Sequence, residues 1–305
     1  MSTFLTATDD LRHRPAPGKR MRDSLFWEVI VPEEDLGLQI YLYLTGSGRA
    51  GYNVVLWGSD TASNRIVLGS GRVPDSVDLD HLDFDGLTVR QPEPLHTCSV
   101  SFHRDDLAVE FEFTGLHEAF SYHRNPDGLP RWFAENRLEQ TGGVRGSIVS
   151  GARCIELDHI GHRDHSWGLR DWNIPQHWKW FVAYTPDGDA VNGWIWIAQG
   201  QWGFAGYVAR DGVTTPIANI DHHADYDPQM NQQRLTATVT DTAGGRTEVV
   251  LEAFGVVELP SHDPMATVIR EAACRGTIDG RPAAGQFETH WVGSYLEQLV
   301  SAATR

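Results

Sequence analysis

The stretch LAVEFEF, residues 107–113, carries the pattern that decides the fold class. Its apolar side chains alternate with Glu110 and Glu112, so an extended chain places them on one face and the two carboxylates on the other. The same alternation recurs in residues 38–44, 178–184, 192–198, 235–240 and 247–257. These segments are predicted to be β-strands, most of them with one buried face.

Short turn signals separate the predicted strands. They are NPDG at 125–128, PDG at 186–188, DG at 211–212, GG at 244–245 and DG at 279–280. Because no helical pattern intervenes, the sheets are expected to be antiparallel. Only residues 294–303 look helical. The sequence therefore predicts an all-β fold with a short C-terminal helix.

The length of 305 residues is typical of two domains. Residues 141–147 are rich in glycine, which suggests a loop, and strand patterns resume after them. We therefore expect one β domain at residues 1–146 and a second at residues 147–305. Each half has the size of an antiparallel barrel of about eight strands.

Charge and composition exclude several classes of function. A net charge of −16 argues against a nucleic-acid partner, although residues 12–22 form a locally basic arm that either docks or stays solvated. No segment is apolar for long enough to span a bilayer, and the N-terminus lacks a signal-peptide pattern, so the cytoplasm is the expected location. Without a Rossmann or P-loop motif, no nucleotide cofactor is expected. The oligomeric state stays open, with a homodimer as one option.

Residues 154–172, CIELDHIGHRDHSWGLRDW, are unusually dense in ionisable side chains. On a strand, Asp164 and Ser166 share one face, whereas Arg163 and His165 share the other. Burying such groups unpaired costs free energy, so they must either be exposed to solvent or be paired with one another by salt bridges and hydrogen bonds. A carboxylate next to an imidazole and a tryptophan suits proton transfer. A salt-bridge clamp between two domains explains the same residues equally well.

Tryptophan is concentrated just after this run. Seven of the 11 tryptophans lie between Trp167 and Trp202, and the pairs 178/180 and 194/196 each project to one face of a strand. They are expected to form either an ordinary core or a barrel interior lined with aromatic rings, which would suit a flat apolar ligand or a carbocation. Tyr122, before a turn, is a further candidate for the pocket.

A metal site is the next alternative for the polar run. His159, His162 and His165 recur every three residues, which places successive imidazoles on opposite faces of a strand and is poor geometry for one tetrahedral ion. We therefore expect no metal there. Ser166 lacks the G-x-S-x-G setting of a nucleophilic serine.

The residues Asp164-His165 and Trp167-Gly168 form a D-H-x-W-G signature. It resembles the superfamily of hydroxyneurosporene synthases, or carotenoid 1,2-hydratases, whose relatives include fungal Diels–Alderases. The resemblance implies two lipocalin-like β-barrel or sandwich domains packed side by side, with a pocket near their junction. It implies Asp164 and His165 as catalytic residues and Trp167 as a cation-stabilising wall.

The expected function is a cofactor-independent acid–base lyase or isomerase of the hydratase, dehydratase or cyclase type, acting on an apolar, isoprenoid-like small molecule. Asp164 would adjust the proton affinity of His165, and His165 would donate or shuttle the proton in the reaction. The expected substrate-binding residues are Arg163, Trp167, Asp171, Trp172, Trp194, Trp196 and Tyr122. The hydratases carry a further Tyr-x-Asp pair, whereas the corresponding residues here, 191–196, contain no carboxylate, so isomerisation, dehydration and cyclisation fit as well as hydration. The alternative is a carrier of a hydrophobic molecule without chemistry.

Overall fold

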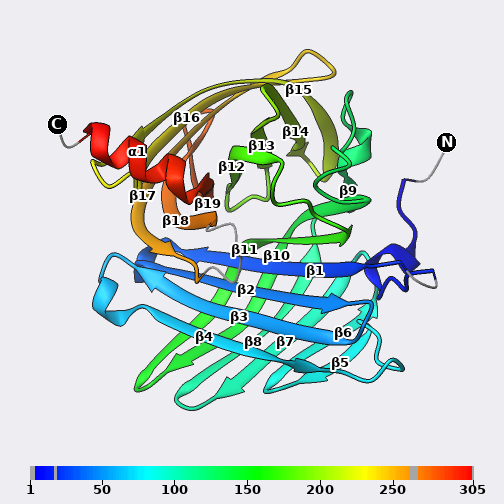
Figure 1. Ribbon diagram of the computed structural model, residues 1–305. Helices are drawn as coiled ribbons and strands as arrows, with labels where there is room; N and C mark the ends of the chain where they lie inside the picture. Colours follow the sequence, from blue (N-terminus) through cyan, green and yellow to red (C-terminus); the bar gives the residue numbers. More distant parts are fainter. Residues whose placement is uncertain (1–3, 17–18, 261–266, 304–305) are drawn as a thin grey trace.

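The computed structural model describes residues 4–16, 19–260 and 267–303, and almost all of its regular structure is β. Two antiparallel units pack side by side: an 11-stranded sheet that curves into a half-barrel, and a closed barrel of eight strands (Figure 1). This confirms the predicted all-β class with two lipocalin-like domains and a C-terminal helix. None of the helices in the described ranges is long and apolar enough to cross a membrane.

The half-barrel sheet has the strand order β4-β3-β2-β1-β11-β10-β8-β7-β6-β5, and β9 pairs with β10. Its strands are β1 (Arg22–Val31), β2 (Leu36–Thr45), β3 (Arg49–Gly58), β4 (Arg65–Arg72), β5 (His81–Phe84), β6 (Leu87–Glu93), β7 (Thr97–Arg104), β8 (Leu107–Gly115), β9 (Phe120–Ser121), β10 (Asn136–Ser150) and β11 (Arg153–Gly168). Four 3-10 helices accompany them: η1 (Ala7–Asp10), η2 (Pro32–Glu34), η3 (Thr61–Ser63) and η4 (Tyr122–Arg124).

The barrel follows the order of the sequence, with each strand hydrogen-bonded to the next and β19 closing onto β12. Its strands are β12 (Pro175–Tyr184), β13 (Ala190–Ala198), β14 (Gln201–Arg210), β15 (Val213–Tyr226), β16 (Gln232–Asp241), β17 (Arg246–Glu258), β18 (Thr267–Ile278) and β19 (Arg281–Val292). Helix α1 (Gly293–Ala303) ends the described chain. Such a chain of hairpins needs only short connections, as the turn signals predicted.

The chain leaves the half-barrel sheet after Gly168 and enters the barrel at Pro175. The domain boundary that was expected between residues 146 and 147 falls inside β10, so the chain does not divide there. The polar run of β11 belongs to the first sheet and not to the second domain. The glycines there serve close packing within a strand: a Cβ on Gly146 would lie 1.9 Å from the carbonyl oxygen of Glu110 on β8, and one on Gly142 would lie 2.3 Å from the ring of Phe113. A glycine-rich segment was therefore mistaken for a loop.

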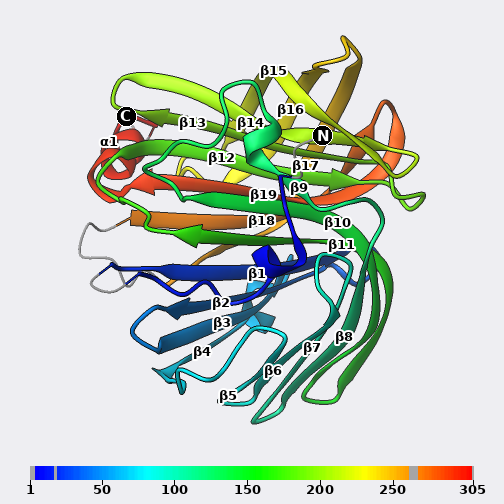
Figure 2. The same ribbon diagram turned by 90° about the vertical axis from the view of Figure 1, so that its right-hand side faces the viewer.

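Strand β11 lies where the two units meet. In Figure 2, β18 and β19 of the barrel run beside β10, β11 and β1 of the sheet. All side chains from Gly161 to Gly168 are buried, because the half-barrel core covers one face of the strand and the barrel covers the other. This double burial explains why neither face of the polar run is solvated.

Candidate functional site

Neighbouring residues of β11 point in opposite directions. Asp164 lies opposite Phe26 of β1 and faces the barrel, whereas His165 lies opposite Leu25 and faces the half-barrel core. The proposed Asp164–His165 pair is therefore corrected: the carboxylate cannot orient the imidazole, because the pleat of the strand separates them. Each residue belongs to a different polar cluster.

The imidazole of His165 is held between two buried carboxylates. Its Nε2 lies 3.1 Å from Oδ1 of Asp23, and its Nδ1 lies 3.6 Å from Oδ1 of Asp10. Burial alone would lower the pKa of His165, but its interactions with the carboxylates of Asp10 and Asp23 outweigh burial and raise the pKa to about 9. His165 is thus a persistent cation that anchors the N-terminal segment, not a proton shuttle near neutral pH.

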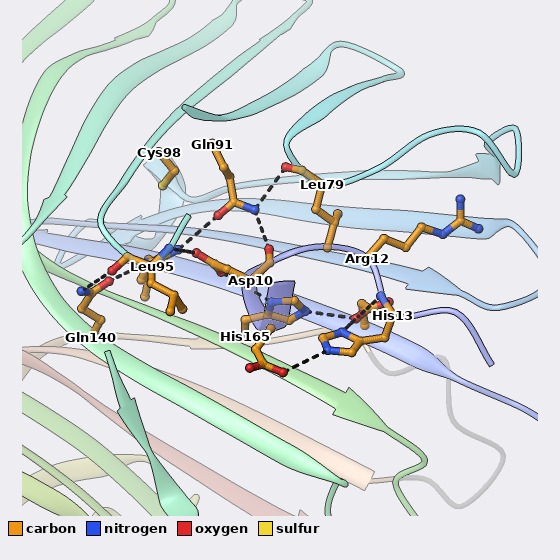
Figure 3. Close-up of polar contacts among 12 residues, drawn as sticks. Asp10, Arg12, His13, Leu79, Gln91, Leu95, Cys98, Gln140 and His165 are labelled. Atoms are coloured by element: carbon orange, nitrogen blue, oxygen red, sulfur yellow. Dashed lines mark hydrogen bonds and ion pairs between the residues drawn. The ribbon is translucent and has the colours of Figure 1, made fainter. Parts of the chain in front are cut away.

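Arg163 completes this network, whose members Asp10, Gln140 and His165 are labelled in Figure 3. Its Nη1 donates to Oδ2 of Asp10 at 2.9 Å, and its Nε donates to Oε1 of Gln140 at 2.9 Å. The ring of Trp167 stacks on His13 with 4.3 Å between centroids. These three β11 residues therefore bind the chain's own residues 10–13, and the arm is docked on the sheet.

Asp164 belongs to the second cluster, between the sheet and the barrel. Its Oδ2 accepts from Nη2 of Arg137 at 2.8 Å, and Nε of Arg137 donates to Oε1 of Glu139 at 2.5 Å. Oε2 of Glu139 lies 2.5 Å from Nε2 of His162. Burial raises the pKa of Asp164 to about 7; Arg137 opposes this rise and Glu139, directly opposite on β10, adds to it. This carboxyl group can therefore give or take a proton near neutral pH.

The barrel adds further buried carboxyl groups to this interface. Glu288 on β19 accepts from Nε1 of Trp178 at 2.5 Å, and Glu271 on β18, opposite Glu288, accepts from Gln286 at 2.7 Å. Burial raises the pKa of both carboxyl groups. The neighbouring Glu288 raises the pKa of Glu271 further, whereas hydrogen bonds with Trp178 and Glu271 oppose the rise at Glu288. Glu28 of β1 is also buried, which raises its pKa well above the ordinary value.

Sequence reasoning missed these acids for a physical reason. Gln286, Glu288 and His290 occupy alternate positions of β19, a pattern that ordinarily marks a solvated strand face. Here that face packs on the half-barrel sheet, so Gln286 and His290 are buried and Glu288 is half-buried. The density of polar residues near the end of the chain was the available signal.

Most of the predicted aromatic residues do meet at this interface. The ring of Trp194 stacks on that of Tyr122, with 6.1 Å between the ring centroids. The same centroid distance is 5.8 Å between Trp172 and Trp178 and 6.2 Å between Trp196 and Trp194. They lie outside the barrel, whose interior is filled by residues of the opposite parity such as Phe181 and Phe287, so the expected tryptophan-lined barrel interior is not observed.

Asp171 takes no part in the aromatic cluster. It is exposed, and its Oδ1 accepts hydrogen bonds from the backbone and the side chain of Asn173. Its place in the turn before β12 is that of a local turn-forming residue.

Two hollows adjoin the interface at opposite ends. A small cavity of about 20 Å³, lined by Ser166, Arg170, Trp172 and Phe133 among others, lies beside the aromatic residues and has room for about one water molecule. A half-open cleft of about 910 Å³ lies at the other end, where Ile30, Ile160, Tyr184 and Ala284 form part of its wall. The large cleft is thus distinct from the surroundings of Asp164.

Comparison with known proteins identifies the family to which the chain belongs. The model of a protein family described as a domain of unknown function, DUF7064, matches residues 6–293. The chain belongs to this family. No curated protein matches its sequence.

Solved structures share the fold of this family member. A candidate AttH from Nitrosomonas europaea superposes with a TM-score of 0.65 at 15% identity, covering 92% of this chain and 99% of that one. Kievitone hydratase from Nectria haematococca superposes with a TM-score of 0.59 at 11% sequence identity, covering 96% of this chain and 94% of that one. CghA superposes with a TM-score of 0.57 at 11% identity, covering 90% of this chain and 88% of that one. At such identities the likeness shows a common fold only.

Proposed function

We propose that this chain is an acid–base lyase or isomerase that acts on an apolar, isoprenoid-like small molecule between the half-barrel sheet and the barrel. The observation that carries the proposal is Asp164, a buried carboxyl group with a pKa of about 7, inside an interface lined by tryptophan. A group that titrates near the working pH is suited to general acid–base catalysis. Two of the solved structures with this fold are named as a hydratase and as CghA, and the hydratase name supports the same reaction class.

The surroundings of Asp164 supply the remaining parts. Protonated Asp164 would donate to an alkene or a leaving hydroxyl, and its conjugate base would remove a proton in the return step. Arg137 holds the carboxyl group in place, at 2.8 Å. The rings of Trp172, Trp178 and Trp194 would stabilise a developing cation and exclude water.

A purely structural clamp explains this cluster less well. Buried ion pairs seldom stabilise a fold relative to apolar packing. Here the buried Glu28 and Glu271 and the half-buried Glu288, all with raised pKa values, accompany Asp164. His290 is also buried between Trp178 and Trp172, with both of its ring nitrogens unpartnered. Polar groups left without partners are costly, and they are typical of a site that awaits a ligand.

Access requires movement of the connection between the two units. The cavity of about 20 Å³ beside Ser166 is too small for an isoprenoid, and Arg170 and Trp172 of the connecting segment 169–174 form part of its wall. Displacing this segment would open a path to Asp164 along the rings of Phe133 and Trp172. The guanidinium carbon of Arg170 lies over both rings, 4.0 Å from the centroid of Phe133 and 4.9 Å from that of Trp172.

The test is proton exchange in deuterated water with a panel of terpenoid alkenes and tertiary alcohols. A hydratase, dehydratase or isomerase incorporates solvent deuterium into its substrate, which mass spectrometry detects for any member of the panel. Asp164→Asn is expected to lower the rate by about 10²–10⁴-fold. Asp158→Asn, an exposed carboxylate that pairs with Arg145 at 3.1 Å, is the matched control and is expected to keep the rate. Equal exchange by wild type and Asp164→Asn would refute the role of Asp164.

A carrier function is the second candidate, because the cleft of about 910 Å³ is large enough for a small molecule and lies away from Asp164. Under this alternative, terpenoids bind and quench tryptophan fluorescence but exchange no deuterium. Binding would then be weakened by Ala284→Trp, which fills the cleft wall, and left unchanged by Asp164→Asn.

A further inference from the structure

The N-terminal arm brings two histidines and a carboxylate together on the half-barrel side of β11. Nδ1 of His13 lies 2.7 Å from Oδ1 of Asp23, and Nε2 of His165 lies 3.1 Å from the same oxygen. One ligand atom from each of the three residues lies within 4.8 Å of the other two. We call this the arm cluster (Figure 3). Its members come from the arm, from β1 and from β11, so only the folded chain assembles it.

The chemistry of the arm cluster matches a zinc site with three protein ligands. Two imidazoles and one carboxylate are a common ligand set for Zn²⁺ with one position left open. Tetrahedral ligands at about 2.0–2.1 Å from zinc lie roughly 3.3 Å from one another. The two distances to Asp23 are shorter by a few tenths of an ångström, because they are hydrogen bonds. Zn²⁺ would displace the protons of these two hydrogen bonds, including the one that His165 carries, and a small shift of the carboxylate would then admit the ion.

A second carboxylate lies behind the imidazole of His165. Oδ1 of Asp10 is 3.6 Å from Nδ1, the ring nitrogen that faces away from Asp23, and both atoms are buried without a hydrogen-bond partner. Arg163 and the backbone N–H of Leu95 hold Asp10 through its other oxygen. A carboxylate behind a metal-binding histidine is the usual arrangement that fixes the tautomer and the ring orientation.

The other histidine is also held in place and remains accessible. The ring of His13 stacks on Trp167 with an angle of 9° between the planes, which orients its Nδ1 towards Asp23. Its side chain is 18% exposed, whereas Asp23 and His165 are each 1% exposed. An ion could therefore enter from solvent on the His13 side.

We propose that His13, Asp23 and His165 bind one Zn²⁺ ion that ties the N-terminal arm to the half-barrel sheet. This site lies on the opposite face of β11 from Asp164 and is independent of the proposed reaction. It also differs from the expected histidine spacing at 159, 162 and 165, because only His165 contributes. The ion would bridge the arm and β11, so it would strengthen the docking of the arm that Arg163 and Trp167 already provide.

The experiment is calorimetric titration of metal-free full-length protein with ZnCl₂, supported by the visible spectrum of the Co²⁺ form. Wild type is expected to bind one ion per chain, with Co²⁺ bands typical of tetrahedral nitrogen and oxygen ligands. His13→Ala removes one ligand from the surface arm and leaves both sheets intact, so it is expected to weaken binding at least 100-fold. Asp10→Asn is expected to weaken it by about 10–100-fold. His103→Ala, an exposed histidine paired with Glu110 at 2.8 Å, is the matched control and should bind like wild type.

Limited trypsin digestion gives a second readout, because the arm contains trypsin sites after Arg12, Lys19 and Arg20. Zn²⁺ is expected to slow cleavage of the arm in wild type and to have no effect in His13→Ala. Binding of much less than one ion per chain would overturn the proposal. Equal affinity in wild type and His13→Ala would also overturn it, and the arm cluster would then be a hydrogen-bonded ion pair only.

Discussion

Replacement of Asp164 by asparagine tests the electrostatics of the interface without any substrate. Burial raises the pKa of this carboxyl group from 3.8 to about 7. The folded state therefore holds a proton that the unfolded state releases between about pH 4 and 7, so ionisation of Asp164 makes wild type less stable as the pH rises through this window. A pKa difference of about three corresponds to about 4 kcal/mol, an upper limit. Asparagine resembles the protonated form and lacks this dependence.

The assay is urea denaturation of wild type and Asp164→Asn at about pH 4.5 and pH 8. The variant is expected to gain stability relative to wild type on going to the higher pH, by up to about 4 kcal/mol. Comparing the two proteins at both pH values cancels the other buried acids, such as Glu271 and Glu288. Asp158→Asn is the control and should follow wild type. If Asp164→Asn and wild type show the same pH dependence, Asp164 is ionised throughout and the proposed acid–base role loses its basis.

Three further perturbations test the fold and the interface. Gly146→Ala places a Cβ 1.9 Å from a backbone oxygen, so it is expected to lower the free energy of unfolding by more than about 2 kcal/mol in urea titrations. The Cβ of the control Gly143→Ala would meet nothing within 4 Å, so this variant should lose no more than about 0.5 kcal/mol. Burial lowers the pKa of His290 to about 3, so stability is lost as the pH falls below about 6.5; His290→Gln should weaken this acid sensitivity in thermal scans, and an unchanged profile would contradict the burial. Tyr122→Phe removes a buried hydrogen bond of 3.0 Å to Asn192 and should cost about 1–3 kcal/mol; a neutral effect would mean that water replaces the phenol.

Local patterns were sufficient to predict the class of the fold. Alternation in residues 107–113 and the short turn signals predicted antiparallel strands, and the structure has β8 at Leu107–Gly115 in such a sheet. Both features depend on neighbouring residues only, since the period of a strand is a property of its backbone. The glycines of β10 were misread, because their requirement comes from close approach of β8, a segment about 30 residues earlier in the chain.

The candidate site shows where local reasoning ends. The density of ionisable residues in 154–172 correctly indicated that they must be wired together when buried. Strand alternation places Asp164 and His165 on opposite faces, so their adjacency in sequence does not make them partners. The aromatic residues were predicted to share a face, but which side of the barrel that face forms depends on how the barrel packs on the sheet.

By itself, the sequence determined the β class, the antiparallel turns and the presence of a polar run that could not stay unpaired. Only the tertiary structure decided the partners. Asp164 pairs with Arg137 because β10 lies beside β11. His165 meets Asp23 because β1 pairs with β11, and it meets Asp10 because the N-terminal segment folds back over the half-barrel. Such partners are distant in sequence and are brought together by strand register and by packing of the two units, which no local pattern encodes.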